Sequence, residues 1–274
     1  MERQEPQQLR GKVAIVTGGT QGLGETIARL FVARGAEAIV ITGRSRERGE
    51  KVKAELEAMG AKTVFVPAEL AELDQVREIV RRCDEAFGRV DCLVNAAALT
   101  DRGTILDTSP ELFDRMFAVN VRAPFFLIQA AAKVMRREGR GGTIVNILST
   151  SAYGGQHFLA AYSASKGALG ILTKNVAYAL MRDSIRVNGL NIGWMNTPGE
   201  HAIQAKAHNA PPDWLERAGA ELPLGRLLEP LEVARAVAFL ASDESVPMSG
   251  ALVDFDQSVQ GAGDPPRPMI RLED

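Results

Sequence analysis

Short apolar runs alternate with longer amphipathic stretches over most of the chain. The apolar runs have few polar positions, which is typical of strands that are buried on both faces. The stretches 47–59, 73–87 and 230–241 repeat apolar residues at helical spacing. This alternation predicts an α/β fold, a single domain in which helices cover both faces of a doubly wound parallel sheet in three layers. The predicted strands begin near Val13, Ala38, Thr63, Val90, Gly142, Ile185 and Ala251.

The two ends of the chain depart from this alternation. Residues 1–10 are mostly polar and predict an N-terminal arm without the apolar segment of a signal peptide. The segment 261–274 contains Pro265, Pro266 and Pro268, which cannot continue a helix, so we expect a C-terminal arm there. The domain is therefore predicted to span residues 11–260.

A glycine-rich turn directly follows the first apolar run. It reads Thr17-Gly18-Gly19-Thr20-Gln21-Gly22-Leu23-Gly24 and leads into a helical pattern. A strand, a glycine turn and a helix N-terminus form the phosphate cradle of a Rossmann-type dinucleotide-binding unit, although a tight turn alone would also need glycine. We predict that the cofactor contacts Gly18, Thr20, Gln21, Gly22, Leu23 and Gly24.

Tyr162 and Lys166 stand four residues apart in a helical stretch. This spacing places two side chains on one face of a helix, about one turn apart. A lysine ammonium there favours the phenolate and lowers the pKa of the tyrosine, which can then exchange a proton with an alcohol oxygen. Pairs with this spacing also occur by chance in many helices, so the pair indicates catalysis only when other features of the chain support it.

Two further polar residues stand at characteristic positions. Ser149 ends the apolar run that begins at Thr143, thirteen positions before Tyr162, and Asn120 lies in the helical stretch 116–126. With these residues the chain resembles the short-chain dehydrogenase/reductase family over about residues 9–260. Residues 17–24 match the family's TGxxxGxG motif, and Tyr162 and Lys166 match its YxxxK motif. The segments 223–226 and 239–243 also resemble family signatures.

The resemblance implies a catalytic role for Asn120, Ser149, Tyr162 and Lys166. Tyr162 would be the acid or base on the substrate oxygen, and Ser149 would donate a hydrogen bond to that oxygen. Lys166 would lower the pKa of the tyrosine and bind the nicotinamide ribose, while Asn120 would hold a water that leads to Lys166. Taken singly, each residue also has a purely structural explanation. Ser149 could simply end a strand, and Asn120 could cap or kink a helix.

The cofactor preference depends on the end of the second predicted strand. Proteins that bind NAD often carry an acid there, whereas this chain has Gly43 followed by Arg44, a guanidinium that suits a 2′-phosphate. We expect NADP to be preferred, while Gln21, which stands where relatives carry a second basic residue, leaves NAD possible. The resemblance adds these expected contacts to the cofactor: Glu69, Leu70, Asn95, Ala96, Ala97, Tyr162, Lys166, Gly193 and Thr197.

The residues expected around the substrate are mainly polar. The resemblance places a mobile lid at about 195–222, in which Pro198, Gly199, Pro211 and Pro212 favour hinges over a rigid helix. Buried polar groups require hydrogen-bonding partners, so this set favours a sugar or polyol. His157 can equally be a packed loop residue. The predicted substrate contacts are Ser149, His157, Trp194, Asn196 and Glu200, and the loops 99–102 and 156–158 are also expected to line the pocket.

Other functions remain open at this point. A reductase of 3-oxoacyl thioesters or small ketones would share the catalytic residues, and Arg136, Arg137 and Arg140 form only a weak basic patch for a carrier protein. A non-catalytic NADP-binding protein would be expected to have lost Tyr162 or Lys166. A methyltransferase has no use for that pair.

Composition narrows the partners. The net charge is −2 with both signs mixed along the chain, which argues against nucleic acid, and no run approaches the length of a membrane span. Two cysteines fit a reducing cytoplasm, and three dispersed histidines predict no metal site. The family resemblance also implies a homo-oligomer, a tetramer or dimer packed through the helices that carry Asn120 and Tyr162.

Overall fold

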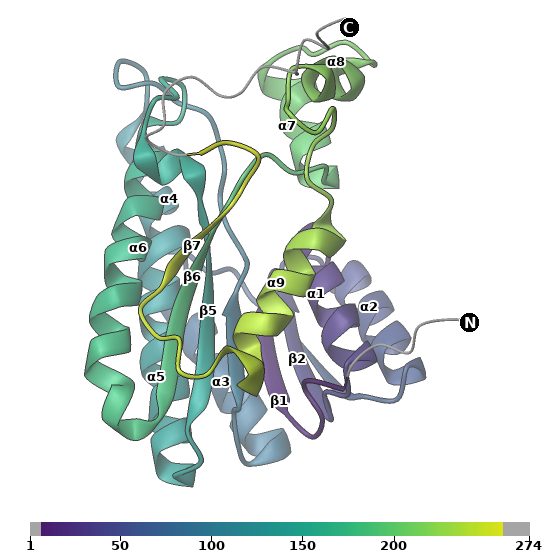
Figure 1. The fold of residues 1–274 in the computed structure, drawn as a ribbon, viewed down its shortest axis with the longest axis vertical. Helices are drawn as coiled ribbons and strands as arrows, with labels where there is room; N and C mark the ends of the chain where they lie inside the picture. Colours follow the sequence, from purple (N-terminus) through teal and green to yellow (C-terminus); the bar gives the residue numbers. More distant parts are fainter. Residues whose placement is uncertain (1–6, 260–274) are drawn as a thin grey trace, which may run out of the picture.

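A computed structural model describes residues 7–259 of the 274-residue chain. Its core is one sheet of seven parallel strands in the order β3-β2-β1-β4-β5-β6-β7 (Figure 1). Each strand begins within two residues of its predicted position, so the predicted fold class is confirmed. The predicted arms fall mostly outside the described residues. The strands are β1 Val13–Thr17, β2 Ala38–Gly43, β3 Lys62–Pro67, β4 Cys92–Asn95, β5 Gly142–Ser149, β6 Ile185–Ile192 and β7 Leu252–Phe255.

Helices cover both faces of the sheet. One hydrophobic core joins α1, α2 and α9 to one face, and a second core joins α3, α5 and α6 to the other. The strands are therefore buried on both faces, as their near-continuous apolar runs indicate. The helices are α1 Gly22–Ala33, α2 Arg46–Ala58, α3 Leu73–Phe87, α4 Pro110–Phe117, α5 Ala123–Glu138, α6 Ala160–Leu180, α7 Pro198–Ala207, α8 Trp214–Ala220 and α9 Pro230–Ala241.

The strand order reverses next to β1. From β1 the chain proceeds outward through β2 to β3, and then returns to β4 on the other side of β1. The loops that follow β1 and β4 therefore diverge, which opens a crevice at the carboxyl ends of the strands. We name this side of the sheet the carboxyl edge and the opposite side the amino edge.

Asn120 does not lie in a regular α-helix. Residues Ala118–Arg122 form a π-helical turn between α4 and α5, and Asn120 is buried within it. A π turn contains one residue more than an α turn and is often found at functional sites. The predicted helical stretch 116–126 therefore contains a change of helix type that its apolar pattern does not reveal.

The predicted lid, residues 195–222, is more regular than expected. Pro198 and Gly199 do not form a hinge, because Pro198 is the first residue of α7. The backbone N–H at this position makes no hydrogen bond within a helix, so a proline is tolerated there. Thr197 caps this helix by accepting a hydrogen bond from the backbone N–H of Glu200 at 3.2 Å. Figure 1 shows α7 and α8 together above the carboxyl edge of the sheet.

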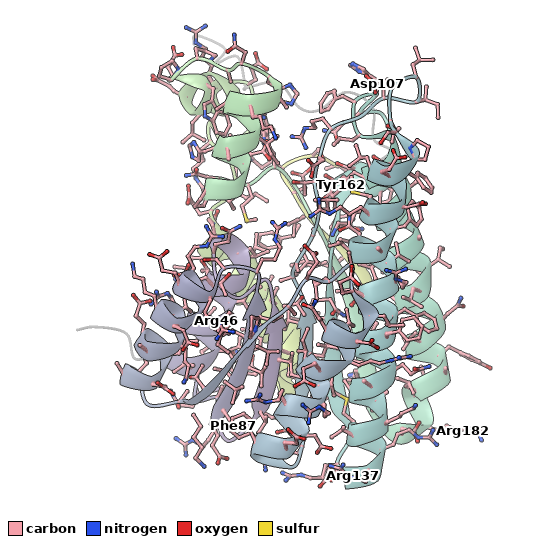
Figure 2. The ribbon with its side chains drawn as sticks, turned by 180° about the vertical axis from the view of Figure 1, so that it is seen from behind. Arg46, Phe87, Asp107, Arg137, Tyr162 and Arg182 are labelled. Carbon is pink, nitrogen blue, oxygen red and sulfur yellow. The ribbon has the colours of Figure 1, made fainter. Side chains whose placement is uncertain are left out.

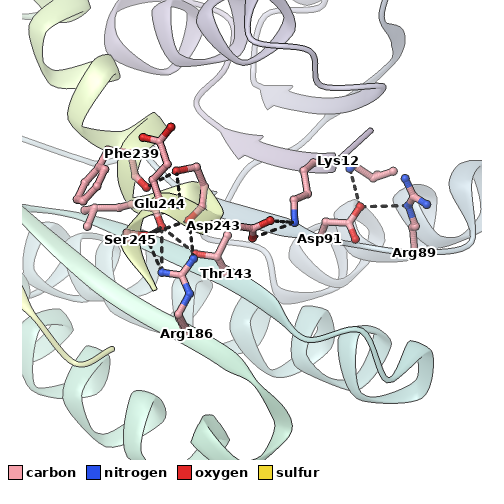
Figure 3. Close-up of polar contacts among 12 residues, drawn as sticks. Lys12, Arg89, Asp91, Thr143, Arg186, Phe239, Asp243, Glu244 and Ser245 are labelled. Atoms are coloured by element: carbon pink, nitrogen blue, oxygen red, sulfur yellow. Dashed lines mark hydrogen bonds and ion pairs between the residues drawn. The ribbon is translucent and has the colours of Figure 1, made fainter. Parts of the chain in front are cut away.

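A polar network closes the amino edge. Arg186, at the start of β6, donates to the backbone carbonyls of Leu240 and Ser242 and to the Ser245 hydroxyl, at 3.4, 2.8 and 2.7 Å. Its positive charge thus lies at the C-terminus of α9, where the helix dipole favours a cation. Figure 3 shows this group continuing through further pairs of charged residues. These are Lys12 with Asp243 at 3.2 Å and Arg89 with Asp91 at 3.1 Å.

Cys83 and Cys92 are both buried, in α3 and β4. Burial raises the pKa of each thiol to about 12, because a thiolate would lose its hydration. They are too far from ionisation at neutral pH to serve as nucleophiles. Among residues 7–259, no group of three or more His, Cys, Asp or Glu residues is placed to hold a metal ion. In the same part of the chain, every helix is too short or too polar to cross a membrane.

Candidate active site

A cavity of about 580 Å³ lies at the carboxyl edge. Its walls come from the loops that follow the strands, from the start of α6 and from α7. Tyr162 faces it from the N-terminal part of α6, and Figure 2 shows this residue on the side of α6 toward α7 and α8. The cavity is large enough for a small-molecule ligand.

The glycine-rich turn forms one wall of the cavity. A Cβ at Gly24 would stand 2.3 Å from the Gly18 carbonyl oxygen, and a Cβ at Gly18 would stand 3.0 Å from Ala97 Cα. Gly22 adopts a φ of +56°, a backbone conformation that residues other than glycine rarely adopt. The glycines therefore keep open a backbone cradle at the N-terminus of α1, as a bound pyrophosphate requires.

Most predicted cofactor contacts line this cavity. Asn95 does not, because its side chain donates to Asn146 Oδ1 at 2.8 Å, away from the cavity. The two residues are register partners in β4 and β5, so their side chains lie on the same face of the sheet. A cofactor contact by the Asn95 side chain is therefore not supported by this structure. The lining includes Gly18, Thr20, Gln21, Gly22, Leu23, Gly24, Arg44, Glu69, Leu70, Ala96, Ala97, Tyr162, Lys166, Gly193 and Thr197.

Three arginines gather where β2 and β3 end. Arg44 lies 4.0 Å from the Glu69 carboxylate, and Arg115 lies 3.5 Å from it. Arg48, in the first turn of α2, also lines the cavity, and sequence analysis does not point to it or to Arg115. The position of Arg48 one turn after Arg44 is the signal that could have identified it. Thr42 is buried here, and its hydroxyl has no hydrogen-bond partner in the described part of the chain.

Tyr162 and Ser149 meet inside the cavity. Burial raises the pKa of Tyr162 to about 12, and a hydrogen bond with the Ser149 side chain opposes that rise. The charges of Arg102 and Glu200 also reach the phenol, the first lowering its pKa and the second raising it. The expected lowering by Lys166 is not found in this structure, because loss of hydration dominates and the lysine points elsewhere.

Lys166 is buried below Tyr162. Its Nζ donates to the Ile147 carbonyl at 2.7 Å and lies 5.7 Å from the centre of the Tyr162 ring. Burial without an anionic partner lowers the pKa of this lysine to about 8. The side chain reaches the cavity wall, where a hydroxyl-rich ligand such as a ribose would supply acceptors for its remaining N–H groups.

Asn120 connects the π turn to the loop after β4. Its Oδ1 accepts from the Leu99 N–H at 2.8 Å, and its Nδ2 donates to the Leu99 carbonyl at 2.9 Å. The same Nδ2 lies 3.1 Å from the Ser165 hydroxyl, which donates to the Tyr162 carbonyl at 2.7 Å. Asn120 thus positions the loop and α6, and the water leading to Lys166 stays a prediction.

Two predicted substrate contacts lie outside the cavity lining. His157 is exposed, outside the cavity lining, and its ring packs edge-on against Phe158, which does line the cavity. Asn196 turns away to donate to Glu229 Oε1 at 3.0 Å. Both predictions were based on chain position, which does not determine the direction of a loop side chain. Ser149, Trp194 and Glu200 do line the cavity.

The α7 wall adds two residues of the stretch 198–221, which is expected to line the pocket but in which sequence analysis singles out neither. Gln204 and His208 line the cavity beside Glu200. The spacing of four residues from 200 to 204 and from 204 to 208 places all three on one helical face, and this is the signal that could have identified them. Arg102, from the loop after β4, meets this face, so the upper part of the cavity is polar.

Comparisons with known proteins identify the family of the chain. A profile of the family described as "Enoyl-(Acyl carrier protein) reductase" matches residues 18–258. A 3alpha-hydroxysteroid dehydrogenase of Mediterraneibacter gnavus is 36% identical over 250 residues, which cover 90% of this chain and 96% of that protein. Galactitol 2-dehydrogenase of Agrobacterium fabrum is 32% identical over 243 residues, covering 86% and 93%.

Among solved structures, L-sorbose reductase from Gluconobacter frateurii, complexed with NADPH and L-sorbose, superimposes with a TM-score of 0.86. It is 28% identical to this chain and the match covers 93% of this chain and 97% of that one. The match thus extends over both the dinucleotide cradle and the tyrosine, serine and lysine in one cavity. The chain belongs to the short-chain dehydrogenase/reductase family and is an oxidoreductase of that family.

Proposed function

We propose that this protein interconverts an alcohol and a carbonyl with NADP(H), on a polar substrate of the sugar or polyol class. The observation that carries the proposal is the pairing of Tyr162 and Ser149 in a cavity whose upper wall is polar. The bound nicotinamide would supply or accept the hydride. The glycine turn would hold its pyrophosphate, and Lys166 would bind its ribose.

The protein's own residues account for the proton. In the direction of carbonyl reduction, Tyr162 donates its phenolic proton to the substrate oxygen, and Ser149 donates a hydrogen bond that holds this oxygen. In oxidation, the same phenol must first lose its proton. A pKa of about 12 opposes that loss, so a charged Lys166 beside a bound ligand has to favour the phenolate.

The arginines at the end of β2 support the NADP preference. Arg44 and Arg48 both line the cavity next to the N-terminus of α2, and together they offer two guanidinium groups to a 2′-phosphate. Glu69 partly offsets the charge of Arg44 and is, beside Gln21, a second feature that would still admit NAD. The sorbose reductase relative is complexed with NADPH.

The arginine assignment has a direct test. Replacing both Arg44 and Arg48 with Ala should raise KM for NADP⁺ at least about tenfold and leave KM for NAD⁺ within about twofold, since only the 2′-phosphate loses its charge-assisted bonds. A wild-type protein that uses NAD⁺ tenfold more efficiently than NADP⁺ would contradict the preference.

The substrate class is supported by the cavity lining. Arg102, Gln156, Glu200 and Gln204 surround the space above Tyr162 with hydrogen-bonding groups. Two of the reported relatives are named for a sugar alcohol or a sugar, while a third is named for a steroid. A steroid presents mostly apolar surface, which would leave the remaining hydrogen-bonding positions of this wall, such as Glu200 Oε2, without partners.

The experiment is an absorbance assay of reduced nicotinamide against a panel of aldoses, ketoses, polyols and hydrophobic ketones. Turnover on sugars or polyols would support the proposal. Turnover on hydrophobic ketones alone would contradict it.

A second candidate is reduction of 3-oxoacyl thioesters or small ketones. It is favoured by the description of the matching family profile, which names a reductase of acyl carrier protein substrates. Reductive turnover of a 3-oxoacyl thioester with NADPH, in the absence of any activity on sugars, would favour it over the sugar proposal.

We also propose a homo-oligomer in the cytoplasm, formed through α5 and α6. Large apolar side chains remain exposed on these helices, with Phe125, Ile171 and Tyr178 exposed by 44%, 63% and 85%. Single exposed apolar residues are common on protein surfaces, but several on two neighbouring helices indicate an interaction surface. Sedimentation as a monomer at micromolar concentration would contradict this association.

A further inference from the structure

A carboxylate and a guanidinium face each other across the upper part of the cavity. Glu200 comes from the first turn of α7 and Arg102 from the loop after β4. Their side chains are only 15% and 17% exposed, and both line the cavity above Tyr162. Arg102 Nη2 lies 3.2 Å from Glu200 Oε1.

One oxygen of Glu200 takes all of its hydrogen bonds. Oε1 accepts from Trp194 Nε1 at 2.9 Å and from Gln204 Nε2 at 2.7 Å, in addition to Arg102. Within residues 7–259, the other oxygen, Oε2, is in no hydrogen bond. A carboxylate oxygen has two acceptor positions, so Oε2 can accept from a ligand hydroxyl.

Arg102 uses three of its five N–H groups within the protein. Its Nη1 donates to the Thr100 carbonyl at 3.0 Å, its Nε donates to His208 Nε2 at 3.2 Å, and its Nη2 is bonded to Glu200. The guanidinium also lies 5.6 Å from the centre of the Phe158 ring.

Both charges act where the reaction takes place. Both side chains line the same cavity as Tyr162, and their charges reach its phenol: that of Arg102 lowers its pKa and that of Glu200 raises it. The pair has no net charge, and Glu200 Oε2 offers a free acceptor position beside it. Such a wall suits a hydroxyl group and repels a carboxylate.

We propose that Glu200, neutralised and held by Arg102, selects neutral hydroxyl-bearing substrates and excludes those that carry a carboxylate. This inference rests on the proposed function and narrows its substrate class to neutral sugars and polyols. A substrate hydroxyl would donate to Glu200 Oε2. A sugar acid would face the carboxylate and find the guanidinium already paired.

The test is Glu200→Gln, which keeps an acceptor oxygen for Trp194 and Gln204 but removes the negative charge. Arg102 would then be free to pair with a substrate carboxylate. Calorimetric titrations with D-gluconate and sorbitol are made in the presence of NADPH, because a reduced cofactor and an alcohol cannot react. We expect the affinity for gluconate to rise at least about tenfold over wild type and the affinity for sorbitol to fall.

Two further variants define the cause. Arg102→Gln combined with Glu200→Gln should lose the gain in gluconate affinity, because no guanidinium remains. Glu221→Gln removes a carboxylate from the exposed end of α8, outside the cavity lining, and should leave both affinities unchanged.

The inference is overturned if Glu200→Gln binds gluconate no more tightly than wild type, which includes no detectable binding. It is also overturned if the gain persists without Arg102. These results are separate from failure of the proposed function, which would appear as wild-type protein without turnover on any sugar or polyol.

Discussion

The two edges of the sheet both carry polar residues and a cavity, of about 580 Å³ at the carboxyl edge and 360 Å³ at the amino edge. At the amino edge the polar groups bind one another, as Arg186 does with the carbonyls at the end of α9 (Figure 3). At the carboxyl edge, Lys166 is buried with a single carbonyl partner, and the Thr42 hydroxyl has none among the described residues.

This difference separates stability from function. A buried polar group without a partner destabilises the folded protein, whereas a paired one is neutral or stabilising. Unpaired groups persist at the carboxyl edge because a ligand can bind them there. Removing a buried polar group should therefore stabilise the cofactor-free protein at the carboxyl edge and destabilise it at the amino edge, while activity should depend on the carboxyl edge alone.

The largest expected effect is on turnover, from Tyr162→Phe. Loss of the phenolic hydroxyl removes proton transfer, so kcat should fall at least about a hundredfold, while cofactor affinity stays within about twofold. Absorbance kinetics and a cofactor titration measure the two quantities. Tyr153→Phe is the matched control, because Tyr153 is 53% exposed and lies outside the cavity lining. Near-normal kcat in Tyr162→Phe would refute the catalytic assignment.

The next effect is the pH dependence that Lys166 imposes on stability. Its pKa of about 8 in the folded protein lies below its ordinary value of 10.5, so the unfolded chain binds more protons between these two pH values. Stability therefore rises with pH across this window, by roughly 3 kcal/mol. Below about pH 8 the full cost of burying the charge is present.

Urea unfolding of the cofactor-free protein from pH 7 to 10 tests this, with Lys166→Met as the reference that lacks the titrating group. We expect the variant to be more stable at pH 7 and its advantage to shrink as the pH rises. A difference in unfolding free energy that does not change with pH would show that Lys166 is not buried as a charge.

At the amino edge, Arg186→Met should lower the free energy of unfolding by about 2 kcal/mol, because several buried carbonyls lose a charged donor. The kcat of the remaining folded protein should be unchanged, since the cavity lies at the other edge. Arg182→Met, at an exposed position nearby, is the control and should have little effect on either quantity. Loss of kcat without loss of stability would break the comparison between the edges.

The smallest expected effects come from a pair of threonines. Thr42→Val removes a buried hydroxyl without a described partner and should stabilise the cofactor-free protein by about 1 kcal/mol. Thr143→Val removes a hydroxyl that donates to the Leu240 carbonyl at 3.2 Å, and it should destabilise by about the same amount. Thermal or urea unfolding measures both. Shifts of the same sign would contradict the proposed difference.

Most of the fold could be predicted from sequence, because strands buried on both faces leave nearly uninterrupted apolar runs. The π turn at Ala118–Arg122 could not, because an added residue in a helical turn keeps the local composition unchanged. The start of α7 was misjudged for another reason. Pro198 breaks helices in their interior but suits their first residue, and only the structure shows which position it occupies.

The site divides in the same way. Residues that directly follow a strand, such as Gly18 and Gly193, line the cavity because the strand end fixes the place of their backbone. His157 and Asn196, whose predicted contacts required a particular side-chain direction, lie outside that lining. The pairing of Arg102 with Glu200 joins residues far apart in the chain, and a contact of this kind cannot be predicted from a local sequence pattern.

The two buried thiols make this protein convenient to label. With a pKa of about 12, Cys83 and Cys92 should not react with maleimides while the chain is folded. A single cysteine introduced at Leu106, which is 94% exposed, would then carry a fluorophore without removal of the native cysteines. Reaction of the native thiols would in turn report unfolding, so one reagent could follow both a surface loop and the integrity of the core.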